Sequence, residues 1–135
     1  MKLNVALIGG GRIAPKHIEA IKLNPKYCKL VAICEKNLFK RRKFNKLRKV
    51  NIYSDIDKML SNERIDLVSI LTESGNHFKH IKKVSKYKKN IVVEKPLCLS
   101  KKHAISLQKL SKSNKINIFV VKQNRFNKAI INLKK

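Results

Sequence analysis

Residues 6–17 read ALIGGGRIAPKH and place three of the chain's four glycines where an apolar run gives way to a helical pattern. The run that precedes the glycines, Val5 to Ile8, is fully apolar and predicts a buried strand. From Ile13 to Leu23 the apolar residues recur at the helical period, which predicts a helix. A strand, a glycine turn and a helix in direct succession are typical of the first unit of an α/β sheet.

The rest of the chain repeats this alternation. Further apolar runs predict strands at residues 29–34, 50–53, 66–71, 90–94 and 116–121. Between them we expect a basic helix that continues to about Leu47, a helix capped by Ser54 or Asp55, a helix that begins at His77 and a helix capped by Ser100. Strands that are apolar throughout and separated by helices predict a doubly wound parallel sheet, covered by helices on both faces. The expected fold is therefore a single Rossmann-type α/β domain.

The composition excludes several other classes of protein. The 135 residues are 43% hydrophobic, enough for a core, yet they contain no long uncharged apolar run and no secretory signal. We therefore expect a cytoplasmic protein that does not insert into membranes. Cys28, Cys34 and Cys98 lack metal-binding spacing and predict reduced thiols rather than a disulfide or zinc framework.

The net charge of +25 has two interpretations. Basic stretches such as residues 39–49 and 79–89 would attract polyanions through the release of counterions. However, lysines are spread over nearly every predicted helix, and no ladder of aromatic residues accompanies them as in single-strand binders. We expect weak, non-specific adhesion to polyanions, and a basic module that binds RNA or another polyanion stays the alternative.

The glycine turn fits the pattern G-x-G-x-x-A, which runs here from Gly9 to Ala14. In this pattern the first glycine permits a tight turn, the second lets a pyrophosphate approach the backbone, and the small final residue lets the helix pack on the strand. The free amides at the start of the helix add to the attraction for phosphate. The residues expected to bind the diphosphate of a nicotinamide dinucleotide are Gly9, Gly10, Gly11, Arg12 and Ile13.

A carboxylate supports this interpretation. Glu35 ends the second predicted strand, where an acid commonly accepts hydrogen bonds from the ribose hydroxyls. Its charge favours NAD because it would repel the extra phosphate of NADP. Lys36, Arg41 and Arg42 lie close in sequence and offer phosphate partners, so NADP is not excluded.

Three stretches, in this order, resemble the N-terminal half of the Gfo/Idh/MocA family of oxidoreductases. They are ALIGGGRIAPKHIEAI (6–21), ILTESGNHFKHI (70–81) and VVEKPLCLS (92–100), the last similar to the family's Glu-Lys-Pro motif. A fourth stretch, VVKQNRFN (120–127), resembles members that oxidise UDP-linked amino-sugar uronic acids for lipopolysaccharide synthesis. The resemblance implies a nicotinamide-dependent sugar oxidoreductase.

The resemblance also implies roles for single residues. Thr72 and His77 would lie along the cofactor, and Glu94 and Lys95 would sit beside the nicotinamide. Lys95 would contact the reacting sugar hydroxyl and assist its proton transfer, and Pro96 would fix the turn, through a cis bond.

Asn124 and Arg125 would face the substrate. His77 and His80 are spaced like metal ligands on one face of a helix, but no third ligand is evident and we expect no metal.

Members of this family continue for a second domain that supplies most of the substrate pocket. We therefore divide the chain into a dinucleotide-binding domain, residues 1–123, and the start of the substrate domain, residues 124–135. We expect little or no activity from the chain alone. Whether it is a fragment, a truncated gene product or half of a split enzyme stays open, as does its oligomeric state.

Overall fold

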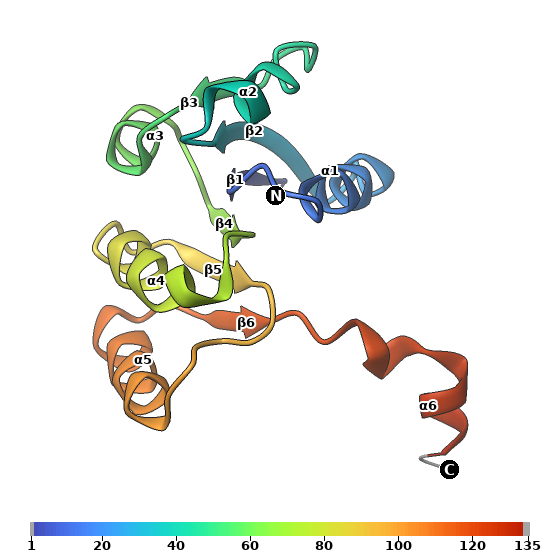
Figure 1. Ribbon diagram of the computed structural model, residues 1–135, viewed down its shortest axis with the longest axis vertical. Coiled ribbons are helices and arrows are strands. Elements are labelled where there is room, and N and C mark those ends of the chain that lie inside the picture. The colour runs from blue at the N-terminus through green and yellow to red at the C-terminus, as the bar shows by residue number, and fades with distance from the viewer. Residues whose placement is uncertain (1, 134–135) are drawn as a thin grey trace.

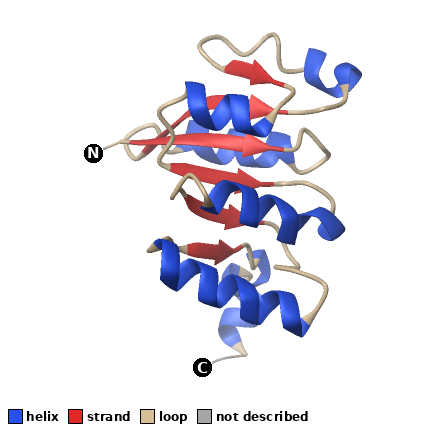
Figure 2. Cartoon of the chain, turned by 90° about the vertical axis from the view of Figure 1, so that its left-hand side faces the viewer, coloured by secondary structure: helices blue, strands red, loops and turns tan. Residues whose placement is uncertain are grey.

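Six parallel strands form one sheet in the computed structural model, which describes residues 2–133. Their bounds are β1 Leu3–Ile8, β2 Cys28–Cys34, β3 Asn51–Tyr53, β4 Leu67–Ile70, β5 Asn90–Val93 and β6 Ile118–Val120. The strand order is β3-β2-β1-β4-β5-β6, and all the arrows point the same way in Figure 2. The chain therefore reverses its direction of winding between β1 and β4, which confirms the doubly wound fold.

Helices connect the strands. Their bounds are α1 Ala14–Leu23, α2 Leu38–Arg42, α3 Ile56–Asn62, α4 His77–Ser85, α5 Lys101–Asn114 and α6 Lys128–Asn132, with 3₁₀ turns η1 Ser74–Asn76 and η2 Gln123–Phe126. Asp55 caps α3 by accepting from the Lys58 amide, and Ser100 caps α5 by accepting from the His103 amide. Helix α2 is shorter than expected, because the chain leaves the helix at Arg42 and continues in turns that bury Phe44.

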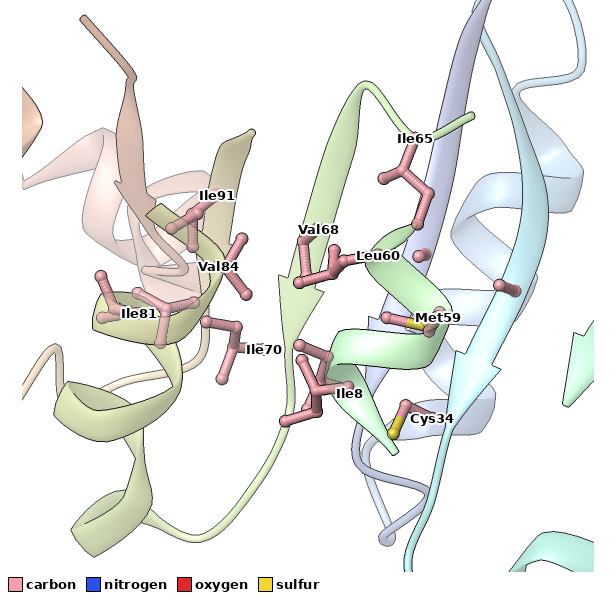
Figure 3. Packing of buried hydrophobic residues seen from close by; sticks show 14 of the residues in the cluster. Ile8, Cys34, Met59, Leu60, Ile65, Val68, Ile70, Ile81, Val84 and Ile91 are labelled. Atoms are coloured by element: carbon pink, nitrogen blue, oxygen red, sulfur yellow. The ribbon is translucent and has the colours of Figure 1, made fainter. Parts of the chain in front are cut away.

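One face of the sheet is covered along most of its width. Helices α3, α4 and α5 lie on this side, on the left in Figure 1. Their apolar side chains meet alternate strand residues in the larger of two hydrophobic clusters, in which Met59, Ile81 and Ile91 are fully buried (Figure 3). This face supplies most of the core.

The opposite face is covered only in part. Helix α1 lies on it, and its cluster of buried residues draws on β1, β2 and the turn around Phe44 but on neither β5 nor β6. One row of paired residues crosses the sheet through Leu7, Ser69, Val92 and Phe119. The exposed fraction in this row rises from 0% at Leu7 to 3% at Ser69 and 56% at Phe119.

Helices therefore lie on both faces of the sheet, as expected, but this face is left uncovered at β6, where Phe119 is exposed. The physical reason is that the chain after β6 does not return over the sheet. It leads away through η2 to α6, which packs against η2 (Figure 1).

Within residues 2–133, no helix is both long enough and apolar enough to span a bilayer. Cys28, Cys34 and Cys98 are free thiols, as expected. Burial raises the pKa of the Cys34 thiol to about 11.

Candidate functional site

The first glycine of the turn cannot carry a side chain. Gly9 follows β1 directly and has a φ of +103°, a conformation that residues with a Cβ rarely adopt. A Cβ at Gly9 would also lie 3.0 Å from backbone atoms of Leu71 and Thr72, at the end of β4. The tight turn expected at Gly9 is therefore confirmed.

The next two glycines differ from each other. A Cβ at Gly10 would lie 2.5 Å from the ring of Phe44 and 3.0 Å from the Glu35 carboxylate, so this position is closed by the protein itself. At Gly11 a Cβ would meet nothing within 4 Å. Open space at the second glycine of the motif is what a closely approaching ligand requires.

The start of α1 leaves its amides free. Among residues 2–133, the backbone amides of Gly11, Arg12 and Ile13 have no hydrogen-bond partner, and no side chain caps the helix. Ala14 is fully buried and begins the helix against the sheet, as the motif predicts. Unpaired amides and the positive end of the helix dipole attract an anion here.

Glu35 is held in place at the mouth of the turn. Its Oε2 accepts a 2.6 Å hydrogen bond from the Gly10 amide, and its Oε1 accepts a 2.8 Å hydrogen bond from the Asn37 amide. The carboxylate at the end of β2 and the glycine turn at the end of β1 thus form one unit.

A cavity of about 300 Å³ opens between these groups. It lies at the carboxyl ends of β1, β2 and β4, where a doubly wound sheet binds its ligand. Its polar and glycine lining comprises Gly9, Gly11, Glu35, Lys36, Lys40, Thr72, Glu73, Asn76, Lys79 and His80. We call it the glycine-turn cavity.

Of the basic neighbours of Glu35 considered from the sequence, only Lys36 lines the glycine-turn cavity. Lys40 lines it as well, whereas Arg41 and Arg42 do not.

Thr72 and His80 form one side of the glycine-turn cavity. The Thr72 hydroxyl lies 2.9 Å from Nδ1 of His80. Burial, followed by the positive charges of Lys79 and Lys36, lowers the pKa of His80, so the neutral imidazole is favoured at this wall.

His77 lies behind the cavity instead of lining it. It is 1% exposed, its Nδ1 lies 2.7 Å from the Pro96 carbonyl oxygen, and its Nε2 lies 2.8 Å from the Thr72 carbonyl oxygen. The ring therefore joins the end of β4 to the turn after β5, and its role as a cofactor contact stays a prediction.

The Glu94 carboxylate contacts His17 of α1, the helix that lies on the less covered face of the sheet. His17 of α1 lies with Nε2 2.9 Å from Glu94 Oε1, and the hydroxyl of Ser69 lies 3.2 Å from His17 Nδ1. Since a carboxylate only accepts, His17 donates from Nε2 to Glu94. This contact fixes the side chain of Glu94, the residue that precedes Lys95 in the sequence.

Lys95 begins a turn, and the bond between Lys95 and Pro96 is cis, as expected. Lys95, Asn124 and Arg125 line a second cavity of about 350 Å³, which we call the lysine cavity. Most of its lining residues are exposed, and only Val121 among them is half-buried. The structure thus brings the three residues predicted at the substrate together, at the edge that also carries the glycine-turn cavity.

Sequence reasoning missed several residues of this site, among them Lys40, Asn76 and Lys79 in the lining of the glycine-turn cavity. Phe44 closes the space above Gly10. The one feature of the sequence that could have indicated its burial is that it is an aromatic residue within a very basic stretch. His17 pairs with Glu94, and no spacing in the sequence predicts that contact. Within residues 2–133, no group of three or more His, Cys, Asp or Glu side chains could hold a metal ion.

Comparisons with known proteins agree with this geometry. The family model described as "Oxidoreductase family, NAD-binding Rossmann fold" matches residues 3–122. The uncharacterized oxidoreductase YhhX of Escherichia coli K12 is 27% identical to the chain over 136 residues, which cover 100% of this chain and 39% of YhhX.

Two solved structures are similar to nearly the whole chain. The WlbA dehydrogenase of Bordetella pertussis, in complex with NADH and UDP-GlcNAcA, is 28% identical with a TM-score of 0.94, and the match covers 99% of this chain and 41% of WlbA. WlbA of Chromobacterium violaceum, with the same ligands, is 27% identical with a TM-score of 0.94, covering 98% and 39%. The chain therefore spans about two fifths of the length of these relatives.

Proposed function

Since the chain belongs to the Gfo/Idh/MocA family of oxidoreductases and forms its NAD-binding Rossmann domain, we propose that it is the cofactor-binding part of a sugar dehydrogenase. The substrate of the complete enzyme is a UDP-linked sugar, of the kind used in lipopolysaccharide synthesis. The observation that carries this proposal is the presence of the glycine-turn cavity and the lysine cavity at the same edge of the sheet.

The fit of NAD to the chain is supported at three points. Gly11 leaves room for the diphosphate, the free amides of Arg12 and Ile13 offer it hydrogen bonds, and Glu35 offers its carboxylate to the ribose. When bound, NAD supplies the hydride acceptor for oxidation of a hydroxyl. Glu35 also disfavours a second phosphate on the ribose, so NAD is preferred to NADP.

At the lysine cavity, Lys95 would hold the reacting hydroxyl of the sugar. Its ammonium group stabilises negative charge on that oxygen as the proton leaves. Asn124 and Arg125 lie around the same cavity and are suited to bind the polar sugar and its phosphates. Support for the UDP-linked class comes from the two WlbA structures, both of which hold UDP-GlcNAcA.

In this proposal the substrate pocket would be completed by protein other than these 135 residues, because the chain spans about two fifths of the length of the relatives it matches. Residues 1–123 are the dinucleotide-binding domain and residues 124–135 begin the next domain. Hydride transfer needs the sugar carbon held against the nicotinamide in a defined geometry, and an open cavity of exposed residues provides little of that restraint. The chain alone therefore binds the cofactor and turns over sugar poorly.

The test is a titration of the purified chain with NADH at low and high salt, followed by fluorescence. We expect binding that persists at high salt and weakens at least about tenfold in Gly11→Asp, because a carboxylate there would occupy the space meant for the diphosphate and repel it.

A short RNA is titrated in parallel. RNA binding that is much tighter than NADH binding and unaffected by Glu35→Gln would support the polyanion-binding alternative instead. Efficient turnover of a UDP-sugar by the 135 residues alone would contradict the need for a further domain.

A further inference from the structure

A third cavity lies at the opposite edge of the sheet from the glycine turn. It has a volume of about 460 Å³, within the range of small-molecule pockets. Its walls come from the residue before β1, the last turn of α1, the start of β2 and the chain between α2 and β3. All four segments lie at the amino-terminal ends of the strands, so we call it the rear cavity.

The rear cavity combines an apolar floor with a cationic rim. The floor is formed by half-buried side chains that pack against the cluster under α1, namely Ile21, Leu30, Leu47 and Val50. The rim carries five exposed cations, Lys2, Lys22, Lys29, Lys46 and Arg48. No acidic residue lines it among the residues that the structure describes.

The high net charge of the chain does not explain this combination by itself. The glycine-turn cavity mixes three lysines with Glu35 and Glu73. A fourth cavity, of about 340 Å³, shares Ile21 and Cys28 with the rear cavity, yet neither lysine nor arginine lines it. The lysine cavity also has cations and, within residues 2–133, no acidic lining residue, but its apolar residues are only Val121 and the exposed Ile130. Among the described residues, the rear cavity therefore differs from the other cavities in placing unpaired cations around a floor of several half-buried apolar side chains.

We propose that the rear cavity binds a single-chain amphiphilic anion, such as a medium-chain fatty acid. The carboxylate lies among the rim cations, and the hydrocarbon tail lies on the floor and extends toward Cys28. Charge complementarity selects the head group, because the rim offers cations only. The floor selects a tail, since each methylene removed from water raises affinity about fourfold.

The site is separate from the proposed function. Its lining residues have no member in common with the glycine-turn cavity or the lysine cavity. NADH is therefore expected not to compete with the fatty acid, and loss of either kind of binding leaves the other in place.

The test is calorimetric titration of the full chain with octanoate, decanoate and dodecanoate, each below its micelle concentration. We expect affinity to rise with chain length, and dodecanol, which lacks the charge, to bind more weakly than dodecanoate. Affinity that does not change with chain length would overturn the proposal, because simple ion pairing at the surface ignores the tail.

A matched pair of variants locates the head group. The double substitution Lys46→Gln with Arg48→Gln removes two rim cations, and we expect dodecanoate to bind about three- to tenfold more weakly. The control Lys101→Gln with Lys102→Gln removes the same charge from the exposed first turn of α5 and is expected to leave affinity unchanged. Equal losses in both double variants would overturn the proposal.

Cysteine alkylation locates the tail. Cys28 lines the rear cavity and is half-buried, whereas Cys98 is half-buried elsewhere. We expect dodecanoate to slow the alkylation of Cys28 and not that of Cys98. Equal protection of both thiols would overturn the proposal, as would stronger binding to anionic phospholipid vesicles than to monomeric dodecanoate.

Discussion

The two cavities at the carboxyl edge of the sheet differ in how far the chain encloses them. The glycine-turn cavity has a floor of buried residues from the ends of β1 and β2, the residue after β4 and α3, including Ile8, Cys34 and Leu71. The lysine cavity is built almost entirely of exposed residues around η2 and α6. The chain therefore encloses the first of these cavities with its own buried residues and leaves the second one open.

The two halves of the sheet also differ in how far helices cover the face on which α1 lies. Strands β1 and β2 lie under α1, whereas β6 exposes Phe119 because the chain leaves the sheet after this strand. The first half of the domain is closed by its own helices. The second half keeps apolar surface exposed at Phe119 of β6.

The largest change in stability and in NADH binding is expected from a side chain at Gly10, the position closed by Phe44 and Glu35. In Gly10→Ala the new methyl group would lie 2.5 Å from the Phe44 ring and 3.0 Å from Glu35, so the turn must shift. We expect a loss of about 1–3 kcal/mol in the free energy of unfolding, together with a loss of NADH binding. Urea denaturation and NADH fluorescence measure the two effects.

Gly11→Ala is the matched control, because its methyl group meets nothing within 4 Å in the chain. Its stability should stay within about 0.5 kcal/mol of the unchanged chain. If Gly10→Ala proved as stable as Gly11→Ala, the glycine-turn cavity would not be the rigid, preformed site described above.

The next largest change in NADH affinity is expected from removal of the negative charge of Glu35. Glu35→Gln removes the carboxylate that accepts from the amides of Gly10 and Asn37 and that is positioned for the ribose. Because charge-assisted hydrogen bonds are the stronger kind, we expect NADH affinity to fall about tenfold and the preference for NADH over NADPH to shrink. Titration with both dinucleotides measures this.

Glu73→Gln makes the same change of charge in the same cavity, but Glu73 is exposed, whereas Glu35 accepts hydrogen bonds from two backbone amides. Its affinity for NADH should change less than about threefold. An equal effect of the two substitutions would mean that overall charge, not the position of Glu35, governs binding.

The enclosed site was predictable because its signals are local. A glycine turn between a strand and a helix, with an acid at the next strand end, specifies positions by spacing alone, and Gly9, Ala14, Glu35 and the Asp55 cap lie as predicted. Burial on both sides of β1 also follows from its continuous apolar run.

The remaining features depend on contacts between distant segments. Phe44 reaches Gly10 and His17 reaches Glu94 across 34 and 77 positions of sequence, respectively, and no period or motif encodes such a meeting. The exposed face of β6 could not be predicted from the sequence for a similar reason. An apolar strand has the same composition whether its own chain or another part of a protein covers it.

A smaller change in stability is expected from the titration of His80 at the wall of the glycine-turn cavity. Burial lowers the pKa of His80 below its ordinary value of 6.5, so the unfolded chain binds a proton there more readily than the folded chain. Stability should therefore decrease as pH falls from about 6.5 toward the folded pKa, and the contribution of His80 should be below about 1 kcal/mol.

His80→Gln keeps a hydrogen-bonding side chain beside Thr72 but cannot titrate. Its unfolding free energy, measured in urea at pH 7.5 and 5.5, should decrease less than that of the unchanged chain. An identical decrease in both would show that His80 is as accessible to protons in the folded chain as in the unfolded one.

The smallest changes in stability and in NADH affinity are expected from substitutions at the lysine cavity. Lys95→Ala removes an exposed side chain from the lysine cavity, and an exposed charge contributes little in water, so stability should stay within about 0.5 kcal/mol and NADH affinity within about threefold. Lys122→Ala, at the same cavity, is the matched control and should behave alike. If Lys95→Ala instead weakened NADH binding as much as Glu35→Gln does, the two cavities would already act as one site in this chain.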